Sequence, residues 1–199
     1  MQAESAPPVI VERMKRDDMS LRALATLRMT VFRGWPYLYD GSLDYEAGYL
    51  DEFLSDNAAV LVVARLGEIP VGMATASPMA TQSDVVKAPF LAAGMGPESL
   101  FYFGESVLLS QFRGLGIGHR FFEEREAAAR TAGASHAAFC AVARGADHPS
   151  RPKDARDLTP FWHGRGYRLA PHLGMTMRWK EVGQHDESDH PMRFWLKRL

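Results

Sequence analysis

A short glycine-rich stretch near the middle of the chain constrains the fold more than any other feature. The segment Gln111-Phe-Arg-Gly-Leu-Gly-Ile-Gly118 joins an apolar run to an amphipathic one. Glycine lets the backbone turn sharply and approach another molecule closely. The apolar run over 100–109 predicts a buried strand, and the periodic run over 116–132 predicts a helix. The sequence therefore predicts a strand, a tight turn and the beginning of a helix, in that order.

The beginning of such a helix is suited to binding an anion. The first N–H groups of a helix have no partner inside it, and the helix dipole places partial positive charge at this end. A pyrophosphate fits this arrangement. The Rossmann fingerprint would need a third glycine where His119 stands, and the chain lacks the Gly-Lys-Ser/Thr ending of a P-loop. A tight turn that uses glycine for its conformation alone stays open as the alternative.

The rest of the chain shows strand and helix patterns in turn. Asp17 or Asp18 is the expected N-cap of the first helix, and Arg28 falls off its apolar face. The helix over 116–132 is expected to turn its apolar side chains inward and Glu126 outward. Strands are predicted over 9–14, 60–64, 71–77, 100–109, 137–142, 173–182 and 191–198, and helices over 19–32, 46–54, 84–93, 116–132 and 158–164.

Length and composition indicate an ordinary globular protein. A chain of 199 residues without a visible repeat or boundary predicts one domain over 9–199, with a flexible tail over 1–8. The net charge of −1 provides no basic field for nucleic acid. Cys140 is the only cysteine, which excludes an intrachain disulfide and favours a reducing compartment. Neither a signal peptide nor a membrane-spanning run is visible, so we expect a cytoplasmic protein that binds no membrane.

The glycine-rich segment resembles the signature of the GNAT superfamily of N-acetyltransferases. Arg113-x-x-Gly116-x-Gly118 matches the (Gln/Arg)-x-x-Gly-x-(Gly/Ala) pattern, and the order of predicted elements agrees with that family over 9–198. Downstream, Phe161-Trp-His-Gly-Arg-Gly-Tyr167 is similar to the short helix and turn after the family's fifth strand. The resemblance implies an α/β (α+β) fold, with a splayed mixed sheet of about six to seven strands flanked by helices.

The resemblance also implies where acetyl-CoA, the expected co-substrate, binds. It would lie in the gap between the fourth and fifth strands, and main-chain groups near Leu108 and Leu109 would pair with its pantetheine arm. A backbone N–H there would also polarise the thioester carbonyl. The pyrophosphate would be held by the backbone of Arg113, Gly114, Leu115, Gly116, Ile117, Gly118 and His119.

Glu105 is the candidate general base, because acyl transfer to an amine requires a proton to leave the ammonium. It lies in the otherwise apolar strand Phe101–Leu109, where glutamate is unusual. Burial raises the pKa of a carboxyl group toward neutrality, which suits a base. The alternative is a structural glutamate bonded to an arginine or to the backbone.

The general acid has no clear candidate. The tyrosine that many family members place on the late helix is replaced by Trp162, whose indole N–H does not titrate usefully. His163, Tyr167, Tyr102 or water would have to serve, unless the CoA thiolate leaves without an acid. Cys140 is interpreted as a small core residue, and Trp162, Trp179, Phe194 and Trp195 as core of the last strands.

No metal site is expected. His136 and Cys140 share a strand face and His148 follows in the next loop, but this spacing matches no common zinc pattern.

The acceptor is expected near the segment Gly34–Tyr45, which in the family borders the acceptor side of the cleft. Its rings and carboxylates suit a cationic amine, and Trp35, Tyr39 and Asp40 are the candidate contacts. Core packing, a dimer contact and turn formation are the alternative roles for these residues.

The sequence thus predicts an acetyl-CoA-dependent N-acetyltransferase that acts on a primary amine of a small molecule or peptide, and a homodimer stays open. One alternative is a non-catalytic acyl-CoA-binding sensor or regulatory domain of the same fold. Another is an enzyme of a different class that binds another nucleotide in the same turn.

Overall fold

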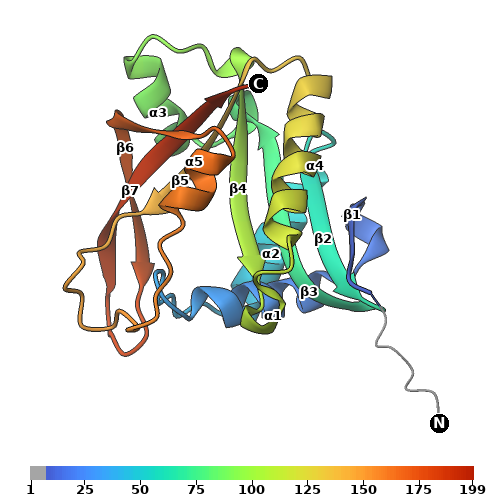
Figure 1. The fold of residues 1–199 in the computed structure, drawn as a ribbon, viewed down its shortest axis with the longest axis vertical. Coiled ribbons are helices and arrows are strands. Elements are labelled where there is room, and N and C mark those ends of the chain that lie inside the picture. The colour runs from blue at the N-terminus through green and yellow to red at the C-terminus, as the bar shows by residue number, and fades with distance from the viewer. Residues whose placement is uncertain (1–7) are drawn as a thin grey trace.

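The computed structural model of the chain describes residues 8–199. The predicted tail over 1–8 lies outside the described residues except for Pro8, which is exposed. The strands are β1 Ile10–Met14, β2 Val60–Leu66, β3 Ile69–Pro78, β4 Leu100–Leu108, β5 His136–Val142, β6 Arg168–Lys180 and β7 Glu187–Arg198 (Figure 1). The α-helices are α1 Leu21–Phe32, α2 Leu43–Ser55, α3 Asp84–Ala92, α4 Ile117–Thr131 and α5 Thr159–Gly164.

All seven strands form one mixed sheet in the order β1-β2-β3-β4-β5-β7-β6. Every neighbouring pair is antiparallel except β4 and β5, which are parallel. A parallel pair needs a crossover, and α4 provides it between these two strands. The expected mixed sheet of six to seven strands flanked by helices is confirmed.

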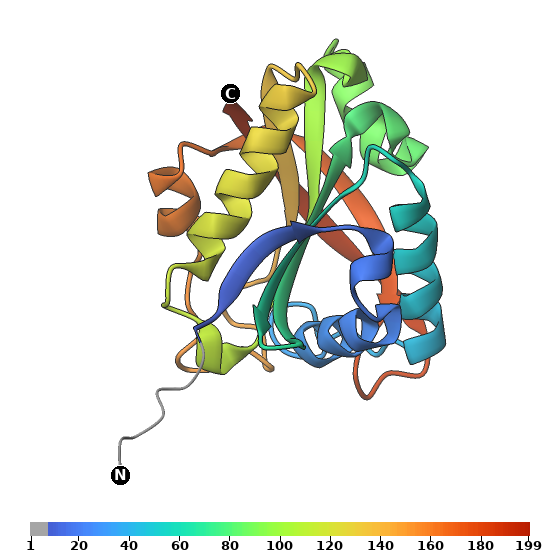
Figure 2. The same ribbon diagram turned by 90° about the vertical axis from the view of Figure 1, so that its right-hand side faces the viewer.

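The helices cover both faces of the sheet (Figures 1 and 2). Helices α4 and α5 lie on one face, while α1, α2 and α3 lie on the other. Apolar side chains fill the space between each layer and the sheet, so the strands in the middle are buried on both sides. The core includes Leu24, Leu27, Leu50, Leu61, Val63, Met73 and Val107 under α1 and α2, and Val62, Val71, Ala74, Ile117 and Phe121 under α4.

The parallel pair β4–β5 is short and ends partway along β4. Its register runs from Leu100 opposite His136 to Phe103 opposite Phe139. Beyond Phe103, β4 continues to Leu108 beside β3 only, while β5 continues to Val142 beside β7 only. The two strands therefore diverge in the middle of the sheet, as expected for a splayed sheet.

The beginning of α1 differs from the prediction. Ser20 is the N-cap, and its hydroxyl oxygen accepts a hydrogen bond from the N–H of Ala23 at 3.4 Å. Asp17 and Asp18 instead belong to a short 3-10 helix, Arg16–Asp18, where the Asp18 carboxylate accepts from the N–H of Lys15. Asp and Ser are comparable N-caps, so the sequence did not separate the two positions.

Among the described residues, no helix is both long and apolar enough to cross a membrane. The expected cytoplasmic location stays a prediction.

Candidate functional site

The glycine-rich turn has the backbone geometry of an anion site. Gly114 and Gly116 both adopt left-handed conformations, with φ of 81° and 80°, which other residues rarely adopt. A Cβ atom at either position would meet no atom within 4 Å, so the backbone there is open to a ligand. Gly116 is also the N-cap of α4, which places the helix dipole at this turn.

The N–H groups of this turn are available for bonding. The N–H groups of His119 and Arg120 donate to the carbonyl of Gly116 at 3.0 and 3.3 Å. Within residues 8–199, the N–H groups from Gly114 to Gly118 have no such backbone partner. Five consecutive free donors at a helix N-terminus suit a pyrophosphate.

The far side of the turn packs against α5. The Phe161 ring lies 4.9 Å from the ring of His119, and a Cβ atom on Gly118 would lie 3.4 Å from Phe161 Cζ. A side chain at Gly118 would therefore press on Phe161. This contact fixes the position of the first turn of α4 relative to α5.

The end of β4 is held in place by bonds on both of its edges. The N–H of Leu109 donates to the carbonyl of Val71 on β3 at 3.0 Å, and Arg113 Nε donates to the carbonyl of Leu108 at 3.3 Å. Because N–H groups alternate between the two edges of a strand, the N–H of Leu108 faces the edge that β5 leaves open. Of the two residues predicted to pair with a pantetheine arm, Leu108 is the one with a main-chain N–H on that edge.

A β-bulge in β4 marks the point where the strands diverge. Ala74 pairs with Ser106 and Ala76 with Phe103, so β4 has one more residue than β3 in this interval. The extra residue lies opposite Thr75, whose hydroxyl oxygen accepts the N–H of Glu105 at 3.2 Å. Gly104 is required here, because a Cβ atom would lie 2.5 Å from Thr75 Oγ1.

Glu105 lies at this bulge with its side chain toward α1 and α2. Only 9 % of the side chain is exposed, and its carboxylate forms an ion pair with Nη1 of Arg28 from α1. Nε of the same Arg28 donates to Glu46 Oε2 on α2 at 2.6 Å. Arg28 is therefore an arginine partner of the kind that the alternative, structural role of Glu105 requires.

Arg28 corrects the sequence interpretation of α1. It was expected off the apolar face, but it is 8 % exposed and its guanidinium lies 4.5 Å from the ring centre of Tyr49. Burial is possible because two carboxylates and an aromatic ring replace the water that the charge loses. These partners come from α2 and β4, and the periodicity of α1 does not indicate them.

The cluster of Arg28, Glu46 and Glu105 carries surplus negative charge. One guanidinium faces two carboxylates, and no other cation of the described chain lies within 4.0 Å of either carboxylate. The Tyr39 hydroxyl donates to Glu46 Oε1 at 2.7 Å. The charge of Glu105 is the main cause that raises the pKa of Tyr49, followed by burial. A cationic group would balance the charge of this cluster.

Of the three predicted acceptor residues, only Tyr39 forms a hydrogen bond with a member of this cluster. Tyr39 joins it through Glu46, as described. Asp40 instead faces two cations, Lys180 Nζ at 2.9 Å and Arg33 Nη1 at 2.6 Å, whose hydrogen bonds lower the pKa of its carboxyl group, that of Lys180 most. The ring of Trp35 lies 5.2 Å from that of His148, in the loop after β5. Glu46 is therefore the carboxylate that shares Arg28 with Glu105, and the sequence did not indicate it.

The connection between α1 and α2 is anchored to the end of β6. Arg144 donates to the carbonyls of Pro36 and Tyr37 at 2.8 and 3.1 Å and pairs with Glu181 at 2.6 Å. Tyr39 also forms a β-bridge with Glu181. These contacts hold the aromatic segment against the last strands, on the same face of the sheet as Glu105.

The two tyrosines considered as general acids, Tyr102 and Tyr167, are poorly suited to that role. Trp162 packs on Phe139 and Trp195, with ring centres 5.2 and 4.9 Å apart. The Tyr167 hydroxyl donates to buried Glu126, and its pKa is raised by burial and then by that charge. Burial likewise raises the pKa of Tyr102, whose hydroxyl lies 3.1 Å from Sγ of Cys140. A raised pKa makes each hydroxyl a weaker acid.

Cys140 is a buried core residue, as predicted. Burial raises the pKa of its thiol to about 11, so the thiolate needed for covalent catalysis is scarce at neutral pH. Among the described residues, no group of three or more metal-ligating side chains is close enough to hold an ion.

Comparison with known proteins gives matches at the level of structure only. No family model matches the chain, and no curated protein matches it in sequence. A ribosomal-protein-alanine N-acetyltransferase from Brucella melitensis superposes with a TM-score of 0.62 at 16 % identity, covering 96 % of this chain and 99 % of that one. A Desulfovibrio desulfuricans protein assigned to the GNAT family of acetyltransferases gives 0.58 at 13 % identity, covering 96 % and 99 %.

A third solved structure contains the expected co-substrate. The protein yncA of Salmonella typhimurium, solved with its cofactor acetyl-CoA, gives a TM-score of 0.61 at 11 % identity and covers 98 % of this chain and 95 % of that one. Together these likenesses show that the chain has the fold found in GNAT acetyltransferases.

Proposed function

We propose that this chain is an acetyl-CoA-dependent N-acetyltransferase that acts on a primary amine by direct attack in a ternary complex. One observation supports the proposal most strongly. Strand β4 carries a buried carboxylate, Glu105, at the bulge where it leaves β5, and runs from there directly into the open glycine turn. A base on β4 and an anion site in the turn that follows it are the two parts that acyl transfer from a CoA thioester requires.

The glycine turn fits the diphosphate of acetyl-CoA. The free N–H groups from Gly114 to Gly118 point from a helix N-terminus, and no side chain covers Gly114 or Gly116. The N–H of Leu108 is placed to bond the thioester carbonyl or the pantetheine arm on the open edge of β4. Acetyl-CoA supplies the activated acyl thioester.

Glu105 removes the proton that prevents the amine from attacking. A protonated amine has no lone pair, so one proton passes to the Glu105 carboxylate before the nitrogen attacks the thioester carbonyl carbon. The carbon–sulfur bond of the tetrahedral intermediate then breaks, the CoA thiolate leaves, and the second proton of the former ammonium passes to the thiolate or to solvent. The thiolate is a tolerable leaving group, which agrees with the weak acidity of Tyr102 and Tyr167.

The surplus negative charge near Glu105 favours a cationic acceptor. Glu46 and Glu105 share one guanidinium, so an ammonium beside them completes the charge balance. Trp35, Tyr39 and Asp40 stay candidate acceptor contacts, with Tyr39 connected to the cluster by its bond to Glu46.

Amine-dependent release of thiol from acetyl-CoA tests this function. We expect turnover with at least one member of a panel of primary amines that includes polyamines, aminoglycosides, amino acids and peptides. Saturable binding of acetyl-CoA without turnover on any amine would favour the acyl-CoA sensor, the alternative supported by Trp162 in place of the usual tyrosine. A larger thermal stabilisation by NAD or ATP than by acetyl-CoA would indicate the other class of enzyme.

A further inference from the structure

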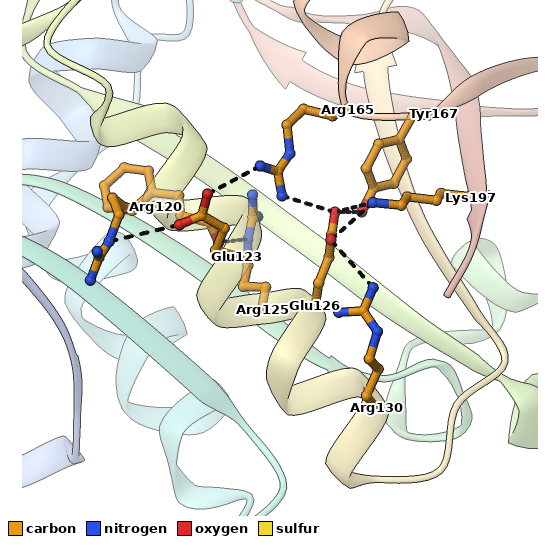
Figure 3. Close-up of polar contacts among 9 residues, drawn as sticks. Arg120, Glu123, Arg125, Glu126, Arg130, Arg165, Tyr167 and Lys197 are labelled. Atoms are coloured by element: carbon orange, nitrogen blue, oxygen red, sulfur yellow. Dashed lines mark hydrogen bonds and ion pairs between the residues drawn. The ribbon is translucent and has the colours of Figure 1, made fainter.

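Arg125 is a buried cation that the proposed mechanism does not use. It lies on α4, is 1 % exposed and is the largest of the fully buried side chains. The neighbouring cations Arg120, Arg130, Arg165 and Lys197 each pair with Glu123 or Glu126 (Figure 3). Arg125 pairs with neither, and among the described residues no carboxylate oxygen lies within 4.0 Å of its guanidinium. Its burial therefore needs another explanation.

The guanidinium of Arg125 bonds to backbone carbonyls at the bulge. Nη1 donates to the carbonyl oxygens of Thr75 and Glu105, both at 3.3 Å, and Nε donates to the carbonyl of Phe121 on its own helix at 3.1 Å. The aromatic rings of Phe103 and Phe122 lie 4.5 and 4.9 Å from its central carbon. One nitrogen thus connects the two strands at the point where the bulge interrupts their pairing.

These bonds complete the polar contacts of the bulge. A bulge leaves backbone groups without partners in the ladder, and an unpaired buried carbonyl is costly. The N–H of Glu105 is bonded by the Thr75 hydroxyl, and its carbonyl is bonded by Arg125. The main chain of Glu105 is therefore fixed on both sides by side chains from other elements.

The burial of this charge is itself costly. Loss of water lowers the pKa of Arg125 to about 10, because the charged form is destabilised. A position lined by Phe103, Phe121 and Phe122 would accept an apolar side chain without this cost. The carbonyls of the bulge explain why an arginine occupies it.

We propose that Arg125 is a positioning residue for Glu105, holding the bulge so that the carboxylate faces the acceptor side of the sheet. This inference rests on the proposed role of Glu105 as the base. Glu105 is bonded from both faces of the sheet, because Arg28 pairs with its carboxylate and Arg125 donates to its carbonyl oxygen. Because α4 begins at the glycine turn and carries Arg125 about two turns later, the same helix links the anion site to the base.

Substitution of Arg125 tests the inference. Arg125→Met keeps an unbranched apolar side chain and removes the donors, and Arg125→Lys keeps the charge and loses the planar fork. Lys197→Met is the matched control. Lys197 is also a partly buried cation beside α4, but it bonds Glu126 and does not bond the bulge. We expect kcat to fall ~10- to 100-fold in Arg125→Met and less in Arg125→Lys, as for a misplaced catalytic group, and to stay within about twofold in Lys197→Met.

A double variant separates positioning from general destabilisation. In a Glu105→Gln background, Arg125→Met is expected to change kcat by less than about twofold, because the base that Arg125 positions is already absent. Acetyl-CoA affinity, measured by calorimetry, is expected to stay within about threefold in Arg125→Met. Amide hydrogen exchange is expected to accelerate at Glu105 and Ser106 in Arg125→Met or Arg125→Lys and not in Lys197→Met.

The results distinguish failure of this inference from failure of the proposed function. Equal loss of kcat from Arg125→Met in the wild-type and Glu105→Gln backgrounds would overturn the positioning role. Unchanged exchange at the bulge, or wild-type kcat in both Arg125 variants, would also overturn it. Wild-type rates in Glu105→Gln alone would instead show that the base is misassigned, and the inference would fall with it.

Discussion

Among single residues, Glu105 matters most for the proposed function. It stands out in the sequence because a glutamate in an apolar strand is unusual, and it lies at a bulge with 9 % of its side chain exposed. Arg28 forms an ion pair with its carboxylate. The same ion pair would also suit a purely structural glutamate, so kinetics must separate the two roles.

Glu105→Gln keeps the shape of the side chain and removes its basicity. We expect kcat to fall about 10²- to 10⁴-fold with acetyl-CoA affinity nearly unchanged, as for the loss of a general base. Steady-state kinetics with an amine that supports turnover measure kcat, and calorimetry measures the affinity for acetyl-CoA. A wild-type kcat in this variant would show that Glu105 is structural.

The acceptor residues give a second prediction at this scale. Tyr39→Ala removes a ring and the bond to Glu46, and Asp40→Asn removes a carboxylate that pairs with Arg33 and Lys180. Each is expected to raise the acceptor KM more than it changes the affinity for acetyl-CoA. Tyr39→Ala is expected to have the larger effect, because only Tyr39 contacts the surplus charge of the Glu46–Glu105 cluster. A defect confined to acetyl-CoA, or a preference for anionic acceptors, would contradict this assignment.

At the scale of elements, the sequence predicted most helices and strands and missed what holds them together. Hydrophobic periodicity locates α1 and α4 because it reports one apolar face. It placed Arg28 and Glu126 on the solvent side, but both are buried, at 8 % and 4 % exposure. Glu126 is buried because Lys197 on β7, Arg165 and Tyr167 in the turn after α5, and Arg130 on its own helix surround it (Figure 3). Partners distant in the chain leave no periodic signal.

The bulge in β4 is the other feature that the sequence did not indicate. Gly104 was visible in the strand, and glycine inside a strand often marks a bulge. The position of the bulge next to Thr75 and Arg125 depends on the register of β3 and on the packing of α4, and hydrophobic periodicity determines neither. The consequence is functional, because the bulge decides where β4 leaves β5 and which face Glu105 occupies.

Gly104→Ala tests the requirement for this bulge. Its Cβ atom would lie 2.5 Å from Thr75 Oγ1, so we expect a loss of ~1–3 kcal/mol in the free energy of unfolding and a lower kcat. Gly48→Ala is the matched control, because Gly48 lies inside α2 with no atom within 4 Å of a Cβ. That change is expected to raise stability by ~0.5–1 kcal/mol. Denaturant unfolding measures both, and a Gly104→Ala variant as stable and active as wild type would contradict the role of the bulge.

At the scale of the whole molecule, the mixed splayed sheet was predicted from a resemblance carried by few residues. The order of elements and the glycine-rich signature sufficed for the fold, although no family model matches the chain and the structural likenesses have 11–16 % identity. Identity at this level shows the fold and leaves acceptor, mechanism and oligomeric state as proposals. The cluster around Glu105 is built from α1, α2, β4 and the connection between α1 and α2, so it depends on tertiary packing that a short motif does not describe.

The affinity of a glycine-turn variant for acetyl-CoA is the sharpest test of the proposed function. Gly116→Val places a side chain where the backbone must approach a pyrophosphate, and Gly133→Val introduces the same change at a glycine of similar φ, 79° against 80°, beyond the other end of α4. Both variants carry the strain of a left-handed valine, so thermal unfolding must first show that each is folded at the assay temperature. Calorimetry is expected to show a dissociation constant at least about tenfold higher for Gly116→Val and nearly unchanged for Gly133→Val. Unchanged affinity in folded Gly116→Val would show that this turn does not hold acetyl-CoA.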